Sequence, residues 1–539
     1  SHKQSALMGN QDELRVYYKT SEAGEWMLLQ TFTENMPNYE NETVILPNPS
    51  STYFIAFEGT NNYGLGVRID NVEVKAGEGV VIPTELVWQG TESNDWFTAA
   101  NWDMNAVPGA TTTVTIPGYV QQFPTITEEA ICKKIIFEEG ATLLGFDKLT
   151  VVEDAFFYQL LTGGTAKDDP NNAIYHHVSA PVANTSAGSV FPLSAFLRQY
   201  NETTQMWENL LAADVMAPGK GYNLWMPEGD ANIMYQGALN KETIEFNGLT
   251  LTGDVNNYSG WHLLGNPYPA AIDMDYLMFP AEMQHSVSVW SNQNGGYITW
   301  NGSEGDLTDG IIPVSQGFFV KVNQDNVNFS VSPDACVHDN TAAYSKDNHK
   351  VIAINVKNNS NQYNETAFIA FSENGNNNYD VFDVVKLDGL EGTPALYTMI
   401  DNMRIKINSR YSASDMPLYF NTNVDGSFTL KVTDLNLRGE ATIEDTFTGV
   451  VMPATVDATY DFTANADDDV ARFVIHFKGF VDVDEEEMNI DVYANRQQVV
   501  VNNQTGEEAT IMLYNVSGQL IETVSTRDVT TRMEVATKG

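Results

Sequence analysis

Alternation of apolar and polar residues, with a period of two, constrains the fold of this chain more than any other feature. Within residues 509–524, Ile511 and Leu513 alternate with polar or smaller neighbours, and a second apolar run follows a turn at Gly518. This period places successive side chains on opposite faces of a strand, and glycine supplies the positive φ that a tight turn needs. The pattern recurs near the start and in the second half of the chain. It predicts an all-β fold of tandem β-sandwich or jelly-roll modules that ends in an immunoglobulin-like C-terminal domain.

Length and charge narrow the partners that the chain can bind. A chain of 539 residues suggests roughly three to five domains. The net charge of −43 repels phosphate backbones and anionic lipids, so nucleic-acid binding is not expected. Such a surface attracts cations, and a structural Ca²⁺ with oxygen ligands is the expected cofactor, although solubility alone also explains the charge. No run of about 18 apolar residues is present, so no transmembrane helix is predicted.

Residues 14–74 are predicted to form strands separated by turns. The expected strands are 14–19, 26–32, 43–46, 53–58 and 67–74. Five strands are too few for a closed jelly roll of about eight. The stretches 14–18, 26–29, 46–51 and 55–59 resemble, in order and spacing, the second half of the cleaved-adhesin domain of gingipains and haemagglutinins. The resemblance implies that residues 1–76 are the C-terminal half of a jelly roll, without the calcium loop of the first half.

The last of these strands changes phase near its middle. Alternation holds as far as Ile69 and is shifted by one residue from Val72 onward. A β-bulge at Asp70 and Asn71 would restore the register. Because a bulge frees a carbonyl beside a carboxylate, Asp70 is a predicted calcium ligand, with Glu58 as a weaker candidate. A solvated aspartate at the bulge is the alternative.

A short linker at residues 77–87 precedes a predicted tryptophan-rich β module at residues 88–155. Its pattern Trp-x-Gly, Asp-Trp, Asn-Trp and Val-Pro places Trp88, Trp96 and Trp102 close together. The pattern resembles a module common in surface proteins of bacteria with type IX secretion. Three tryptophans could stack on sugar rings, but a small aromatic core is the favoured interpretation.

An approximate internal duplication is predicted within residues 156–345. Segments 177–181, 200–207 and 219–224 recur in the same order as 262–267, 289–300 and 315–320. The spacing indicates two copies of a β-unit of about ninety residues.

Two local features of this region invite a functional interpretation. The Gly265–Pro269 segment is a rigid turn and a candidate position for a cis-proline, and it is interpreted as a structural corner. His176 and His177 are adjacent. Neighbours on a strand face opposite sides, so the two histidines are expected to lie one inside and one outside and not to chelate one ion.

Residues 346–479 are predicted to form a further β-sandwich domain, followed by an immunoglobulin-like domain at residues 480–539 that is expected to be truncated at its end. The segments 380–387, 444–449 and 472–477 resemble the same region of type IX secretion cargo.

The C-terminal hairpin resembles the type A sorting domain of type IX substrates. Leu513, Tyr514 and Gly518 match the hydrophobic-Tyr-Asn-x-x-Gly pattern of that domain. The resemblance implies export across an outer membrane to the cell exterior. The partners that it implies are the translocon pore, an outer-membrane shuttle protein and a sortase, with a possible host or glycan ligand. The first residues carry no apolar leader, so the sequence is expected to begin after processing or inside the gene product.

The search for catalytic motifs returns no specific signal. The chain has no His-Glu-x-x-His, no Gly-x-Ser-x-Gly, no phosphate-binding Gly-Lys loop and no dinucleotide fingerprint. Cys132 and Cys336 are its only cysteines, and two buried thiols are favoured over one bridge, a question that their Cα separation decides.

Together these features predict a non-enzymatic protein that is secreted or attached to the cell surface, with an adhesin or surface-structural role. One alternative is the non-catalytic C-terminal part of a larger secreted hydrolase, a protease or glycosidase. Another is a glycan-binding module that uses Trp88, Trp96 and Trp102, or the loop at Tyr63.

Overall fold

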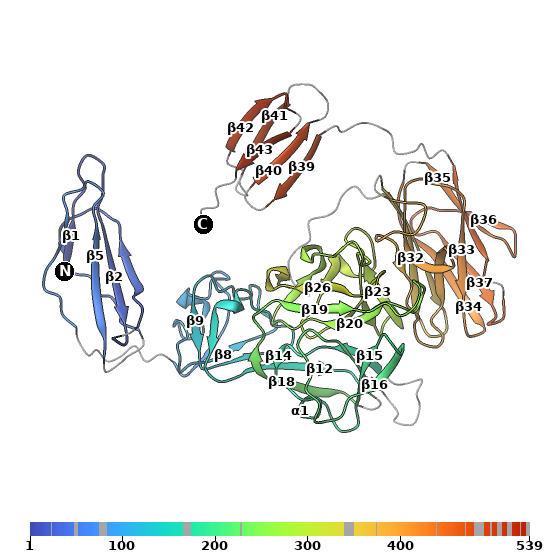
Figure 1. The fold of residues 1–539 in the computed structure, drawn as a ribbon, viewed down its shortest axis with the longest axis horizontal. Coiled ribbons are helices and arrows are strands. Elements are labelled where there is room, and N and C mark those ends of the chain that lie inside the picture. The colour runs from blue at the N-terminus through green and yellow to red at the C-terminus, as the bar shows by residue number, and fades with distance from the viewer. Residues whose placement is uncertain are drawn as a thin grey trace. The chain divides into compact units, whose positions relative to one another are not determined.

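The regular secondary structure of the described residues is almost entirely β-strand (Figure 1). The structure is a computed structural model, and it describes residues 1–22, 24–47, 52–74, 83–164, 174–226, 229–338, 350–372, 375–437, 439–468, 470–478, 490–495, 498–503, 509–514, 520–528 and 530–534. Within these ranges the α-helical structure is limited to α1 (Ala187–Val190). The predicted all-β class is therefore confirmed. No helix in the described part of the chain is long and apolar enough to cross a membrane.

The chain divides into two compact units. Unit 1 comprises residues 1–283, 287–292 and 307–344, and unit 2 comprises residues 284–286, 293–306 and 345–539. Two short segments from the middle of the sequence therefore belong to unit 2. Each unit is described by itself.

The first module of unit 1 consists of two three-stranded sheets. One has the order β4-β1-β6 and the other β3-β2-β5. The strands are β1 (His2–Gln4), β2 (Glu13–Lys19), β3 (Met27–Phe32), β4 (Met36–Glu40), β5 (Phe54–Thr60) and β6 (Val67–Ile69). Leu14, Val16 and Tyr18 alternate along β2 and are buried. Four of the five predicted strands exist, but residues 43–46 are not a strand, and β4 lies just before them.

The bulge predicted at Asp70 and Asn71 is wrong. Strand β6 ends at Ile69, because its partner β1 pairs only with residues 67–69. Asn71 then adopts a left-handed φ of 51°, which takes the chain out of the sheet. Val72 and Val74 are 57% and 64% exposed, so no second pair of apolar side chains returns to the core.

A six-stranded sheet follows, with the order β14-β18-β12-β10-β8-β7. Its strands are β7 (Glu85–Val87), β8 (Thr113–Ile116), β10 (Lys134–Phe137), β12 (Ala155–Leu161), β14 (Val182–Ala183) and β18 (Ala231–Leu239). Strands β7, β8, β10 and β12 are mutually parallel, and β18 closes the series in the antiparallel direction. The sheet continues through residue 155, where a module boundary was predicted.

The parallel strands recur at a regular spacing in the sequence. Ile116 lies beside Phe137 on the next strand, and Phe137 lies beside Phe157 on the one after it. The spacings are therefore 21 and 20 residues. A second parallel pair, β9 (Ala130–Cys132) with β11 (Leu149–Val151), repeats the arrangement. The rings of Phe137 and Phe157 stack with centroids 4.3 Å apart, so the repeat is filled by aromatic packing.

The two sheets that follow repeat one strand order. The first has the path β13-β17-β15 and the second β20-β25-β22, with every pair antiparallel. The strands are β13 (Ile174–Val178), β15 (Phe196–Asn201), β16 (Met206–Asn209), β17 (Tyr222–Met226), β20 (Trp261–Gly265), β22 (Val287–Ser291) and β25 (Gly317–Lys321). The sequence pairs that suggested a duplication thus lie on equivalent strands.

The turn after β20 contains no cis peptide bond, and none is present elsewhere in the described ranges. The candidate cis-proline at Gly265–Pro269 is therefore wrong. The side chain of Asn266 fixes this corner instead, because its amide donates to the carbonyls of Ala270 and Pro313 and its oxygen accepts from the backbone of Tyr268.

Five short strands complete unit 1. They are β19 (Ile244–Leu249) paired with β26 (Val327–Val331), and β21 (Ala271–Asp273) between β24 (Ile311–Ile312) and β27 (Cys336–Val337).

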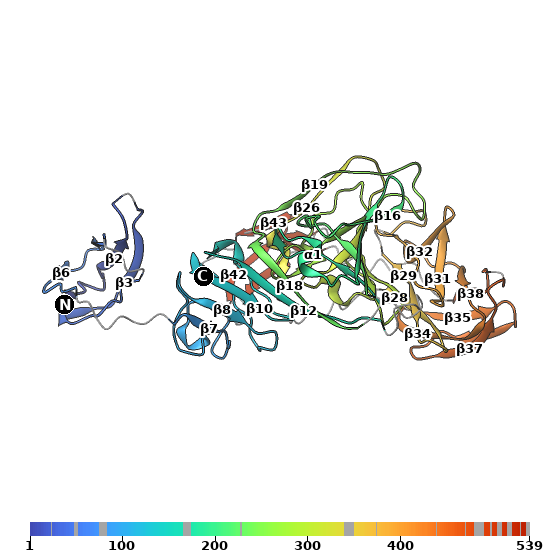
Figure 2. The same cartoon turned by 90° about the horizontal axis from the view of Figure 1, so that it is seen from below.

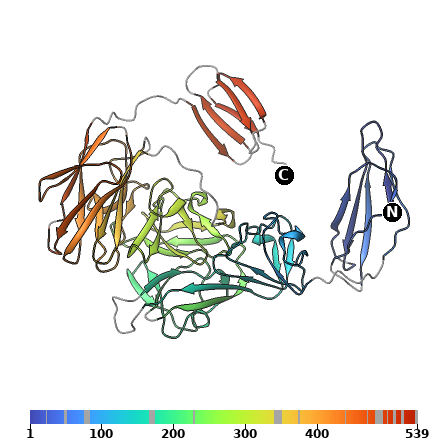
Figure 3. The same cartoon turned by 180° about the vertical axis from the view of Figure 1, so that it is seen from behind.

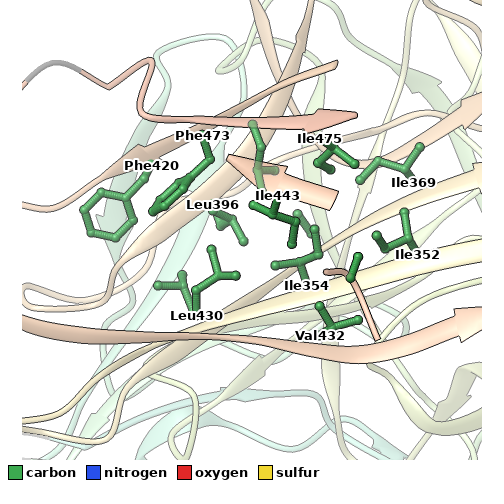
Figure 4. Packing of buried hydrophobic residues seen from close by; sticks show 14 of the residues in the cluster. Ile352, Ile354, Ile369, Leu396, Phe420, Leu430, Val432, Ile443, Phe473 and Ile475 are labelled. Carbon is green, nitrogen blue, oxygen red and sulfur yellow. The ribbon is translucent and has the colours of Figure 1, made fainter. Parts of the chain in front are cut away.

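Unit 2 is built on one long sheet (Figure 2), and its larger hydrophobic cluster is shown in Figure 4. The path is β36-β35-β38-β33-β31-β32-β29-β28-β34-β37, and β30 pairs with β32. The strands are β28 (Lys350–Asn358), β29 (Asn364–Phe371), β30 (Val384–Val385), β31 (Ala395–Ile400), β32 (Met403–Arg410), β33 (Met416–Asn421), β34 (Gly426–Asn436), β35 (Glu440–Asp445), β36 (Val450–Pro453), β37 (Thr459–Ala464) and β38 (Phe473–Lys478). Strand β23 (Gly296–Trp300) belongs to the same unit.

The core of unit 2 joins strands from both ends of this path. Ile354 on β28 and Leu430 on β34 pack in one buried cluster with Ile443 on β35 and Ile475 on β38 (Figure 4). The two halves of the sheet therefore cover each other's apolar face, as in a β-sandwich.

The last described strands pair among themselves (red in Figure 3). They are β39 (Ile490–Asn495), β40 (Gln498–Asn503), β41 (Ala509–Tyr514), β42 (Leu520–Thr526) and β43 (Thr530–Glu534). Strands β41 and β42 form an antiparallel pair in which Leu513 lies opposite Glu522. Gly518, the predicted turn residue, lies outside the described residues.

The buried tryptophans give a test of the core of residues 88–155. Trp102→Ala removes a ring that touches Trp88 and Trp96, so it should lower the free energy of unfolding by about 3–5 kcal/mol. Tyr119→Ala removes a ring that is 83% exposed and should change it by less than about 0.5 kcal/mol. Urea unfolding of both variants measures the difference, and equal losses would contradict a tryptophan core.

Candidate functional site

The predicted calcium ligands lie on different sheets of the first module. Glu58 is on β5, and its carboxylate accepts a hydrogen bond of 2.6 Å from the hydroxyl of Tyr17. Asp70 follows β6, where its carbonyl accepts from the amine of Ser1 and its carboxylate accepts from the backbone of Asn71. In the ranges that the structure describes, no group of three or more His, Cys, Asp or Glu side chains is placed to hold a metal. Calcium binding stays a prediction, which a calcium titration followed by melting temperature tests.

A loop that begins at Asn61 is held by one buried carboxylate. Asp12 accepts hydrogen bonds from the backbone of Asn62, Gly64 and Gly66 at 2.7, 2.9 and 2.6 Å. The bonds from Gly64 and Asn62 lower the pKa of Asp12. A Cβ at Gly64 would lie 2.7 Å from the carboxylate, so only glycine fits there.

This loop presents an aromatic side chain to solvent. Tyr63 has a left-handed φ of 63°, and its side chain is 81% exposed. Because Asp12 accepts from the backbone on both sides of Tyr63, the backbone that carries this ring is ordered at the module's surface. An exposed aromatic ring on an ordered backbone is suited to stacking on an apolar or sugar surface.

The tryptophans of residues 88–155 are not a binding platform. Trp88, Trp96 and Trp102 are at most 1% exposed. The indole of Trp102 donates to the carbonyl of Trp96, and that of Trp88 donates to the carbonyl of Gln122. Glycan stacking on these three rings is therefore wrong, and the preferred core interpretation holds.

The adjacent histidines face opposite ways, as expected. His177 is buried beside the rings of Trp207, Trp290 and Phe319. Burial lowers the pKa of His177 to about 3, so it is neutral at ordinary pH. His176 is partly exposed, and its Nε2 lies 2.8 Å from the carbonyl of Thr162. The pair offers no shared metal site.

A polar groove of about 630 Å³ lies in unit 1. Its walls carry the charged residues Asp147, Lys148, Lys241, Glu242 and Asp334, together with the half-buried Cys336. Burial raises the pKa of the Cys336 thiol, which disfavours the nucleophilic thiolate. Cys132 and Cys336 are both free, so the predicted absence of a bridge agrees with the structure, but of the two predicted buried thiols only Cys132 is buried.

Unit 2 contains a cluster of buried charges that the sequence did not reveal. The amine of Lys406 on β32 lies 2.9 Å from Glu365 and 3.0 Å from Asp306. The second oxygen of Glu365 lies 3.0 Å from Lys386. Lys406 stands between Ile405 and Ile407 in a strand that is buried on both faces. This position is the sequence signal for the cluster, because a buried lysine needs a partner of opposite charge.

Unit 2 contains a second buried ion pair. Arg472 contacts both oxygens of Asp445, at 3.2 and 2.9 Å, and its guanidinium lies 4.4 Å from the ring centroid of Phe462. The hydroxyl of Tyr460 donates to the same carboxylate. Burial raises the pKa of Asp445, but these hydrogen bonds outweigh it and hold the pKa below its usual value. The pair fixes strand β35 to the residue before β38.

The predicted sorting residues are described only in part. Leu513 is half-buried, whereas its neighbour Met512 is exposed. Tyr514 ends strand β41, and Gly518 is outside the described residues. The hairpin exists, but its role in export stays a prediction.

Two comparisons show which known proteins the chain is similar to. A family model described as a domain of unknown function (DUF8693) matches residues 166–477, which is more than half of the chain. The minor fimbrium subunit Mfa5 of Porphyromonas gingivalis is 22% identical over 316 residues, covering 51% of this chain and 25% of that protein. The chain thus spans about a quarter of the length of this curated relative.

The buried imidazole should make the protein sensitive to acid. The folded pKa of His177, about 3, lies below its ordinary value of 6.5, so the unfolded state binds one more proton between these pH values. The free energy of unfolding should then fall by about 1.4 kcal/mol for each pH unit below 6.5. His177→Phe should remove this contribution.

Urea unfolding at several pH values measures the slope for both proteins. His476→Gln is the control, because Asp415 and Glu444 raise the pKa of that histidine and it stabilises the fold at low pH instead. Equal slopes for the wild type and His177→Phe would contradict the assignment.

Proposed function

This chain belongs to the family described as a domain of unknown function (DUF8693), and from that premise we propose that it is a non-catalytic structural protein of a bacterial cell surface with an adhesin-like role. The observation that carries the proposal is the similarity of an all-β chain to a minor fimbrium subunit. Fimbrial subunits are surface proteins, and the similarity supports a surface role for this chain.

The arrangement of charged groups supports a structural role. In unit 2 the buried acids and bases described above pair with one another, as Glu365 does with Lys386 and Lys406. Groups that serve catalysis need a pKa matched to their task and access to a substrate. Groups that are buried and paired in this way have little access to a substrate from solvent.

The ligand contact is assigned to the loop that carries Tyr63. We expect purified protein to bind to a glycan array or to matrix proteins, and Tyr63→Ala to reduce that binding at least tenfold, which corresponds to about 1.4 kcal/mol. Tyr119→Ala is the matched control, because that ring is equally exposed but lies in another module. No binding to any glycan or matrix protein, together with turnover of a substrate, would overturn the proposal.

The proposal includes export by type IX secretion through the C-terminal hairpin. The residues assigned to the signal are Leu513, Tyr514 and Gly518, and the partners are the translocon pore, an outer-membrane shuttle protein and a sortase. The paired strands β41 and β42 support this assignment, because the hairpin pattern of sorting domains needs such a pair.

Export can be tested with two neighbouring substitutions. Leu513→Asp places a charge on the half-buried face of β41, so the protein should accumulate in the periplasm of a bacterium that has type IX secretion. Met512→Asp places the same charge on the exposed face and should leave export unchanged. Antibody labelling of intact and lysed cells measures the distribution. Surface labelling of Leu513→Asp at the wild-type level would refute the signal.

A further inference from the structure

A lysine amine in unit 2 is buried between two carboxylates. The side chains of Lys406, Asp306 and Glu365 are 3%, 15% and 4% exposed. The amine nitrogen of Lys406 lies 3.0 Å from Oδ2 of Asp306 and 2.9 Å from Oε1 of Glu365. Asp306 and Lys406 are 100 positions apart in the chain. The arrangement brings a nucleophile, an acyl carbon and a proton carrier together in one buried place.

The geometry holds the acyl group in a fixed orientation. Oδ1 of Asp306 accepts a hydrogen bond of 2.7 Å from the backbone of Thr299. Oδ2 faces the amine, so the carboxyl carbon lies one bond beyond an atom that Lys406 already contacts. Intramolecular reactions gain most when the reacting atoms are held close in a fixed orientation, and the contact of Nζ with Oδ2 brings Nζ near Cγ.

We propose that Lys406 and Asp306 join in an intramolecular amide, an isopeptide bond, with Glu365 as the proton carrier. The bond forms between Nζ of Lys406 and Cγ of Asp306. The bond that breaks is that between Cγ and Oδ2, and one water molecule leaves. No oxidant, reductant or other reagent is consumed.

The reaction begins with a proton transfer. Burial lowers the pKa of Lys406, but the two carboxylates outweigh it and keep the resting amine protonated. The step requires that Nζ give a proton to Asp306 along their hydrogen bond, and burial favours this transfer because it raises the pKa of that carboxyl. The neutral amine then attacks Cγ. Glu365 takes the second proton from nitrogen and delivers it to the departing oxygen.

The charges around the site remain balanced after the bond has formed. The amide removes one positive and one negative charge, and Glu365 keeps its contact with Lys386 at 3.0 Å. The new carbonyl retains Oδ1 as acceptor for the backbone of Thr299. The remaining amide hydrogen can donate to the carbonyl of Tyr297, which Lys406 contacts at 2.8 Å. Lys386 is therefore the group that allows Lys406 to become neutral.

The mass of the denatured full-length chain tests the bond directly. We expect a mass one water lower than the mass calculated from the sequence. A tryptic digest should contain the peptide of Asp306 joined to the peptide of Lys406. Lys406→Arg and Glu365→Gln should each restore the calculated mass, because the first removes the nucleophile and the second the proton carrier.

A surface contact of the same kind provides the matched control. Lys431 and Asp457 lie 2.7 Å apart but are both exposed, so their peptides should be recovered separately, and Lys431→Arg should leave the water loss unchanged. The decisive measurement is made on the wild-type chain and does not depend on the variants folding. A wild-type mass equal to the calculated mass, with separate peptides, would show an ion pair only and would overturn the proposal. That result leaves the proposed surface role untouched.

Discussion

The burial of Glu365 is the constraint on which the architecture of unit 2 depends. This carboxylate lies in β29, between neighbouring strands of the long sheet, where an unpaired charge is strongly destabilising. Lys386 and Lys406 neutralise it, and Lys406 in turn requires Asp306. Since Asp306 belongs to residues 293–306, the cluster is one of the contacts that join this segment to the sandwich of unit 2. Removing one member would leave a buried charge without its partner, a change that costs about 3–5 kcal/mol.

Carboxylates also fix loops elsewhere in this acidic chain. Asp12 accepts three backbone hydrogen bonds from the loop of Tyr63. Glu202 accepts from the backbone of Thr252 and Gly260, and Asp383 accepts from the backbone of Asp380 and Ser409. A carboxylate with two or three N–H donors orders a loop without a hydrophobic core beneath it. Part of the negative charge therefore has a structural purpose beyond solubility.

Strand positions were predictable wherever one face of a strand is buried. The alternation in β2 and in β41 is local, so each could be read from a few residues. Strand β6 was predicted too long, because its end depends on how many residues of β1 pair with it. Lys406 left a signal, because it lies between Ile405 and Ile407, but its partners Glu365 and Asp306 could not be found, because they are distant from it in the sequence. The parallel strands left a signal in the spacing of Ile116, Phe137 and Phe157, which a search for a repeat of about 21 residues would have detected.

The edges of the sheet that contains these parallel strands are possible sites of contact with other chains. A parallel stack of strands exposes unpaired backbone at each end, and such edges invite association with other chains. Here β12 is covered by the antiparallel strand β18, and the segment after β7 turns into the tryptophan core, where Trp88 pairs with Trp102. The sheet therefore ends at β14 on one side and at β7 on the other. If a partner binds at the exposed ring of Tyr63, the backbone that carries this ring is already ordered by Asp12 before the partner arrives.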